Sequence, residues 1–376
     1  MKHGKTILIA SLFILLISVM GAFGAAQKEA QQKAPAWPTR PIDIIVGWSA
    51  GGTSDTTVRA VAREMQDFLG VEIRITNMAG SNGGIAYQNV HQAPPDGYRW
   101  FGGAQVQATY PITRQAQVGW EEMYPFPAGM GSTTIYVRSD SGYNNIMDLV
   151  EAIKKAPGVV NFGSTSRGGN GSIFGEAFAR AAGVGDKVRE VPYNGGREAG
   201  RYLIAKEVEF ISVSSGDVSD WAVEGTLKPL LNLYEDDWEW QGVKFPSVKH
   251  NFPELLIYQA INPYWGFAVK RNTPEHIMVR IAEAFEYAVR QERFRKALHD
   301  RGIIVAPLMG KQADEMVARV GSGRGWAQFD LGIVSVSPSQ FNIPRLTEWK
   351  FPYNDSSRNV LPWHPQVEQI AVRLKR

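Results

Sequence analysis

The chain has 376 residues, of which 44% are hydrophobic and 20% charged, and its formal net charge is +3. It contains no cysteine, which excludes a disulfide framework, a thiolate metal site and a lipid-anchor cysteine. The balance of 40 basic and 37 acidic residues leaves no basic excess for nucleic acid and no charge run for a membrane surface. A chain of this length predicts two domains.

The first 26 residues have the form of an export signal. Lys2 and Lys5 form a basic start, residues 7–20 are almost wholly apolar, and small residues at 24–26 suit a signal peptidase. We expect cleavage after Ala26, then a flexible leader over residues 27–36. An uncleaved anchor is the alternative, although the apolar run is short for a spanning helix. The mature product should be soluble and exported to a periplasm.

Residues 42–55 predict a strand, a glycine-rich turn and a helix. β-branched residues at 44–46 indicate a buried strand, and apolar residues at helical spacing over 58–69 indicate a helix that Gly70 ends. This arrangement directs the free N–H groups and the positive dipole end of the helix into the turn. The small and hydroxyl residues that would admit an anion there are Ser49, Gly51, Gly52, Thr53 and Ser54.

Other interpretations of this turn are open. Residues 47–51 fit G-x-S-x-G, the nucleophile elbow of exported serine hydrolases, with Ser49 as nucleophile. However, an oxyanion strand and loop should precede the elbow, whereas the strand at 44–46 is the first of the mature chain, and no downstream histidine stands in a recognisable acid–histidine setting. A nucleotide site lacks a complete phosphate-binding motif. The turn could also bind nothing, and Asp55 could simply stabilise its own helix dipole.

The pattern continues along the chain. We expect a strand at 71–75, a glycine-rich loop at 77–84 and a helix at 85–91. Further on, a strand at 159–163 leads into the Gly/Ser/Thr loop 164–172 and a helix at 173–182. This second strand, loop and helix repeat the architecture of the first. We take them to belong to a second domain.

Several motifs in order resemble one family, the Bug-type periplasmic substrate-binding receptors of tripartite tricarboxylate transporters. They are residues 46–55 (VGWSAGGTSD), residues 77–84 with three glycines, residues 93–98 (APPDGY), residues 191–195 (VPYNG) and Trp265-Gly266. The family reads V-P-F-x-x-G-G-x-x-D in the first motif, where this chain has Gly47 and Trp48 in place of Pro and Phe. The resemblance spans roughly residues 37–334.

The resemblance implies an α/β type II periplasmic-binding-protein fold, with two α/β lobes joined by crossover strands and a ligand cleft between them. We expect residues 37–138 and 262–334 to form lobe 1 and residues 139–261 to form lobe 2. The resemblance also implies a monomeric, non-enzymatic receptor that binds a small carboxylated organic acid without metal or cofactor. Its partners would be one large and one small integral-membrane transporter subunit.

The expected ligand-binding residues come mainly from the two loops. They are Trp48, Ser49, Gly51, Gly52, Thr53, Asp55, Ser164, Thr165, Ser166, Arg167, Gly168, Tyr193, Ser214 and Asp217. Arg167 could take a carboxylate bidentately or could be a solvated loop residue. Trp48 could stack on the ligand or belong to the core, and Asp217 would suit an ammonium-bearing ligand.

Two expectations concern the C-terminal third. Thr273 as cap and Pro274 at the first position predict a helix that runs to Asp300. Residues 335–376 hold five prolines and two tryptophans and lie beyond the usual end of the family. We expect this extension to wrap lobe 1 as irregular structure, with contact to a partner as the alternative.

Overall fold

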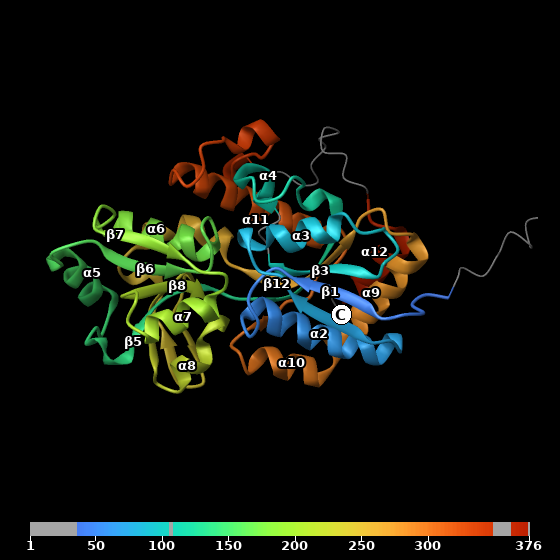
Figure 1. The fold of residues 1–376 in the computed structure, drawn as a ribbon, viewed down its shortest axis with the longest axis horizontal. Coiled ribbons are helices and arrows are strands. Elements are labelled where there is room, and N and C mark those ends of the chain that lie inside the picture. The colour runs from blue at the N-terminus through green and yellow to red at the C-terminus, as the bar shows by residue number, and fades with distance from the viewer. Residues whose placement is uncertain (1–35, 105–107, 349–361, 375–376) are drawn as a thin grey trace, which may run out of the picture. The chain divides into compact units, whose positions relative to one another are not determined.

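The computed structural model describes residues 36–104, 108–348 and 362–374 (Figure 1). The chain divides into two compact units, residues 1–39 and residues 40–376, and the larger unit contains both main sheets and every helix named below. The predicted signal peptide and nearly all of the predicted leader lie outside the described residues.

The first sheet has the strand order β13-β4-β12-β3-β1-β2. Strands β1 (Ile42–Val46), β2 (Ile73–Asn77) and β3 (Arg99–Ala104) are parallel, whereas β4 (Met123–Met130), β12 (Tyr264–Lys270) and β13 (Ile304–Val305) pair antiparallel with their neighbours. Helices α2 (Thr53–Leu69) and α9 (Glu275–Arg290) pack together on one face, and α3 (Gly84–His91) lies on the other (Figure 1). Because β1 is covered on both faces, four of its five residues are buried.

The second sheet has the order β7-β6-β8-β5-β9. Its strands are β5 (Thr133–Arg138), β6 (Val160–Ser164), β7 (Val188–Pro192), β8 (Phe210–Ser214) and β9 (Leu227–Asn232). Helices α6 (Asn170–Ala181) and α7 (Gly196–Ile204) cover opposite faces of it, while α5 (Ile146–Lys155) and α8 (Ser219–Val223) complete the lobe (Figure 1). The capping box of Asn145 and Asp148 fixes the start of α5.

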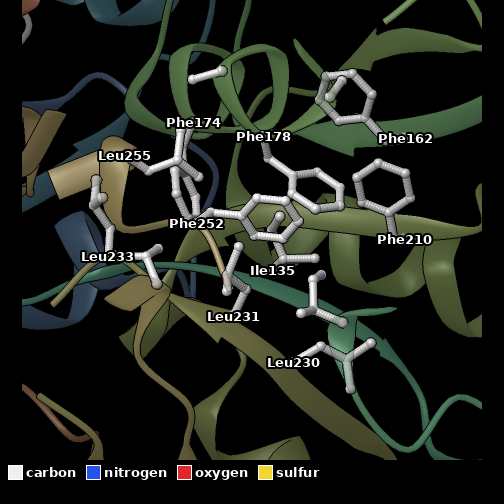
Figure 2. Close-up of a cluster of buried hydrophobic side chains, with 14 of the residues drawn as sticks. Ile135, Phe162, Phe174, Phe178, Phe210, Leu230, Leu231, Leu233, Phe252 and Leu255 are labelled. Atoms are coloured by element: carbon white, nitrogen blue, oxygen red, sulfur yellow. The ribbon is translucent and has the colours of Figure 1, made fainter. Parts of the chain in front are cut away.

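The core of the second lobe is rich in aromatic side chains (Figure 2). The rings of Phe162 on β6 and Phe210 on β8 stack with centroids 5.2 Å apart. Phe178 on α6 meets Phe210 and Phe252 edge to face. This packing holds the end of β6, and therefore the loop that follows it, against α6.

The chain passes between the two main sheets twice. It leaves the first sheet after β4, enters the second at β5, and returns at β12 after the 3₁₀ segment η7 (Pro253–Ile261). The lobe boundary expected at residue 138 therefore lies one strand later than the change of sheet. β5 is an ordinary buried strand, and nothing in its residues distinguishes the sheet that it joins.

The helix predicted over residues 273–300 is two helices. α9 begins at Glu275, with Pro274 as its N-cap, and α10 (Glu292–His299) follows a break at Gln291, where the backbone is extended. No glycine or proline marks the break in the sequence. It lets α10 pack on both α2 and β13, so tertiary contacts decide it.

The C-terminal region begins with α11 (Lys311–Asp330), which contacts β4, α6 and η7. The 3₁₀ segments η8 (Pro338–Phe341) and η9 (Leu346–Glu348) pack on α11, and α12 (Pro365–Leu374) packs on α9. The expectation of irregular structure is wrong for α12. Trp363, just before it, is buried against the rings of Tyr124 and Phe126 on β4.

Candidate functional site

The turn between β1 and α2 is built as an open helix start. Gly51 has a φ of +81°, a conformation that favours glycine, and the N-cap residue Gly52 supplies no side-chain cap. The first amides of α2 therefore need acceptors from elsewhere. One carboxylate near this end is already occupied, because Asp55 accepts hydrogen bonds from Gly51 N, from Arg59 and from Asn77.

The second loop joins β6 to α6. Ser164 at its start donates to Glu190, and Arg167 is exposed and forms an ion pair with the same carboxylate at 3.2 Å. The Ser166 hydroxyl donates to the carbonyl of Thr165. The Thr165 hydroxyl is buried and has no hydrogen-bond partner among the described residues.

The two loops meet at one small cavity. It has a volume of about 20 Å³ and is lined by thirteen residues: Trp48, Ser49, Gly52, Thr53, Ser54, Asn82, Thr165, Asn170, Gly195, Gly196, Ser214, Asp217 and Trp265. Ser49 Oγ and Thr165 Oγ1, one from each lobe, are both buried without a partner in the described part of the chain. A buried hydroxyl without a partner costs free energy, so two of them at one cavity indicate a place for a polar ligand.

Asp217 crosses from the second lobe to the start of α2. Its Oδ1 accepts from Thr53 N at 2.8 Å and from Thr53 Oγ1 at 2.7 Å. Burial raises the pKa of Asp217, while the Thr53 donors and the charge of Arg301 act in the opposite direction. The protein's own carboxylate thus occupies the first free amide of α2, the type of position at which helices bind anions.

Two glycines leave room for the side chains that meet at this contact. A Cβ at Gly195 would lie 2.1 Å from Ser49 Oγ, and a Cβ at Gly196 would lie 2.0 Å from Asp217 Oδ2. Ser49 N also donates to the carbonyl of Asn194. A larger residue at position 195 would hold the lobes apart, and one at position 196 would displace Asp217 within the second lobe.

Half of the residues expected from the sequence line the cavity. Those that do are Trp48, Ser49, Gly52, Thr53, Thr165, Ser214 and Asp217. Those that do not are Gly51, Asp55, Ser164, Ser166, Arg167, Gly168 and Tyr193. Tyr193 instead stacks on Tyr202 with ring centroids 4.5 Å apart. Trp48 lines the cavity and is also a neighbour of Phe101 in the core.

Sequence reasoning missed several lining residues. Asn82, Gly195 and Trp265 stand in motifs that carried the family resemblance, and could have been named from them. Asn170 and Gly196 each begin a helix, and only packing brings them to the cavity.

A larger hollow of about 800 Å³ lies elsewhere, beside α3 and the short helix α4 (Tyr110–Thr113). It contains no residue of the turn 47–53 or of the loop 164–172. Its polar lining residues are mainly glutamines, and it is wide open. The small cavity, which combines both loops with unpaired hydroxyls, is therefore the better candidate site.

The residues that the structure describes contain no group of three or more His, Cys, Asp or Glu side chains placed to hold a metal ion. They also contain no helix that combines the length and apolar character needed to cross a membrane.

Solved structures show the fold of the chain. The chain is similar to the periplasmic binding protein BugD, with a TM-score of 0.68, 21% identity, and coverage of 79% of this chain and 99% of that one. It is also similar to R. palustris Rpa4515 with adipate, with a TM-score of 0.69, 19% identity, and coverage of 80% and 99%. The fold is thus the two-lobed α/β fold of periplasmic binding proteins, as expected.

The family follows from the sequence match. Residues 57–320 match the family described as "Tripartite tricarboxylate transporter family receptor", and the chain belongs to it. A protein of Cupriavidus necator, "UPF0065 protein in gbd 5'region", is 26% identical over 290 residues, which cover 75% of this chain and 85% of that protein. The predicted Bug-type resemblance is confirmed.

The hydrolase interpretation of Ser49 is thereby wrong. The family consists of solute-binding proteins, which are not enzymes. The geometry agrees, because Ser49 Oγ bonds to no histidine among the described residues. The G-x-S-x-G pattern arises here because a tight turn before a helix selects the same small residues.

Proposed function

We propose that this protein captures a small carboxylated organic acid between its lobes and delivers it to a tripartite membrane transporter. The observation that carries the proposal is the shared cavity, where Ser49 Oγ and Thr165 Oγ1 face one site from opposite lobes without partners among the residues that the structure describes. Hydroxyl donors and helix-start amides suit a carboxylate. The structure of Rpa4515 holds adipate, a dicarboxylate, in a related fold.

The size of the cavity implies lobe movement. A volume of about 20 Å³ accommodates roughly one water molecule and no organic acid. The ligand must therefore bind an open form, and the lobes close on it by rotation about the two crossings between the sheets. Contacts present only in the closed form, such as those of Thr165, then favour closure when the ligand is bound.

The remaining features of the proposal follow from the family. A receptor of this type works in the periplasm, which agrees with the predicted signal peptide, and hands its ligand to one large and one small membrane subunit. Affinity in the micromolar range needs about 8 kcal/mol, which a few charge-assisted hydrogen bonds and burial of the ligand can supply without a cofactor.

Calorimetric titration of the mature protein with succinate, glutarate and adipate tests the proposal. We expect binding of at least one acid, and a loss of affinity of about tenfold in Ser49→Ala and in Thr165→Val, since each removes a donor to a charged group. Ser212→Ala is the matched control, because the Ser212 hydroxyl is also buried without a partner in the described residues but does not line the cavity. Equal losses in all three variants would contradict the assigned site, and failure of every acid would contradict the function.

A further inference from the structure

Arg324, on α11, is a buried cation with incomplete hydrogen bonding. Its side chain is fully buried. Its Nη2 donates to the carbonyl of Gly168 at 2.7 Å, whereas Nε and Nη1 are buried and have no partner among the described residues. Within the part of the chain that the structure describes, no carboxylate forms an ion pair with it.

The guanidinium contacts a loop that contributes to the candidate site. Gly168 belongs to the loop whose Thr165 lines the cavity. On the other lobe, Tyr110 donates to the carbonyl of Asn82, which also lines the cavity. α11 also packs on the helix that carries Tyr110, because a Cβ at Gly325, the residue after Arg324, would lie 2.9 Å from Ile112 Cδ1. Arg324 therefore stands on a helix that contacts segments of both lobes next to the cavity.

Such a charge is costly in the ligand-free protein. A buried ion without a counter-ion loses its hydration and gains little in return. Burial lowers the pKa of Arg324 to about 10, so that the side chain is still charged at neutral pH. An anion that enters the site would offset the cost, because charges attract strongly where water is excluded.

Support of the Gly168 loop does not account for the charge. Gln328, one turn further along α11, donates to the same carbonyl oxygen at 2.7 Å. A neutral side chain thus already satisfies this acceptor. The positive charge and the two remaining nitrogens of Arg324 point to another role.

We propose that Arg324 determines ligand specificity, with Nε and Nη1 receiving a second anionic group of the ligand when the lobes close. The inference rests on the proposed carboxylate site at Ser49 and Thr165. It assigns the ligand to the acids that carry two anionic groups, such as dicarboxylates or carboxylates with a sulfonate. A planar guanidinium with two available nitrogens binds such a group bidentately.

The test compares acids that differ only in the second charge. We would titrate the mature protein with adipate and hexanoate, succinate and butyrate, and terephthalate and benzoate. In the wild type, the diacid of the pair that binds should bind at least about tenfold more tightly than its monoacid, the effect of one charge-assisted pair. Because this comparison needs no variant, it stands even if a substitution at the buried site prevents folding.

Two substitutions on α11 that keep side-chain length separate charge from loop support. Arg324→Met should lower diacid affinity about tenfold or more and leave monoacid affinity nearly unchanged, so that the preference disappears. Gln328→Met removes the other donor to Gly168 but no charge, and should keep the preference. Arg324→Lys should restore part of it.

The outcomes distinguish the two proposals. If the wild type binds acids without preferring diacids, or if Arg324→Met weakens both members of a pair equally, the role of Arg324 is wrong and the carboxylate receptor stands. If the wild type binds none of the six acids, the proposed function itself fails, and this inference with it.

Discussion

Two arginines are buried in the part of the chain that the structure describes, and their surroundings differ. Arg271, directly after β12, pairs through both Nη atoms with Asp314 on α11, and its guanidinium lies 4.8 Å from the centre of the Tyr124 ring. Trp363 from the C-terminal extension donates to the same carboxylate. Arg324 is buried at least as deeply and donates to one carbonyl oxygen.

The comparison distinguishes a buried arginine that stabilises the fold from one whose charge is available to a ligand. A buried guanidinium with a bidentate carboxylate is satisfied inside the protein and holds elements together, in this case β12, α11 and the extension. A buried guanidinium without an acid contributes no such stability and is left for an outside partner. Of the two, only Arg324 bonds to a loop of the candidate site, as expected for a cation that binds the ligand.

The largest expected effect comes from removing the partner of Arg271. Asp314→Ala should lower the free energy of unfolding by about 3–5 kcal/mol, because it leaves a buried charge without compensation. Urea denaturation of the ligand-free protein measures this. Asp330→Ala is the control, because its ion pair with Arg345 is half exposed and should contribute only about 0–1 kcal/mol. Similar losses of unfolding free energy in Asp314→Ala and Asp330→Ala would show that the buried pair of Arg271 stabilises the fold no more than an exposed pair does, and the distinction between Arg271 and Arg324 would then fail.

Removal of Arg324 should raise the free energy of unfolding, whereas removal of the partner of Arg271 should lower it. Arg324→Met replaces an unpaired buried charge with an apolar side chain of similar length, and should raise the unfolding free energy of the ligand-free protein by about 1 kcal/mol. The same denaturation experiment measures it. A loss of about 2 kcal/mol or more would show that Arg324 is as structural as Arg271.

The smallest effect concerns Asp217, the buried charge of opposite sign. Its pKa is raised by burial, so the folded protein holds this proton more tightly than the unfolded chain. Stability from this group is therefore complete below its ordinary pKa of 3.8 and is lost as the pH rises through the raised pKa. Asp217→Asn does not titrate and keeps an acceptor for Thr53. The variant should therefore gain stability relative to the wild type from about pH 4 upward, by about 1 kcal/mol for each pH unit that separates the folded from the unfolded pKa.

Denaturation curves at a series of pH values check this expectation. The exposed Asp330→Asn supplies a control with no buried proton. The expectation fails if the difference in unfolding free energy between Asp217→Asn and the wild type stays constant with pH, or if it shifts in favour of the wild type as the pH rises. Either result would mean that the Thr53 hydrogen bonds outweigh burial.

Local sequence was sufficient for the elements and for one half of the site. The β-branched run at 44–46, the glycines of the turn and Gly70 predicted β1, the helix start and the end of α2, because these depend on neighbouring residues. The repeated strand, loop and helix, together with the cleft that the family resemblance implied, predicted that the turn and the loop 164–172 face one site. Ser49 and Thr165 could therefore be named in advance.

The sequence could not tell which cation serves the site. It drew attention to Arg167, which stands inside the loop, but this side chain is exposed and pairs with Glu190. Arg324 lies 156 positions beyond Gly168 in a helix with no motif, yet it bonds to that residue. Local patterns determine strands, turns and helices because they act between neighbours in the chain. Only the packing of α11 against both lobes decides which distant arginine is buried near the cleft, and whether a carboxylate lies close enough to pair with it.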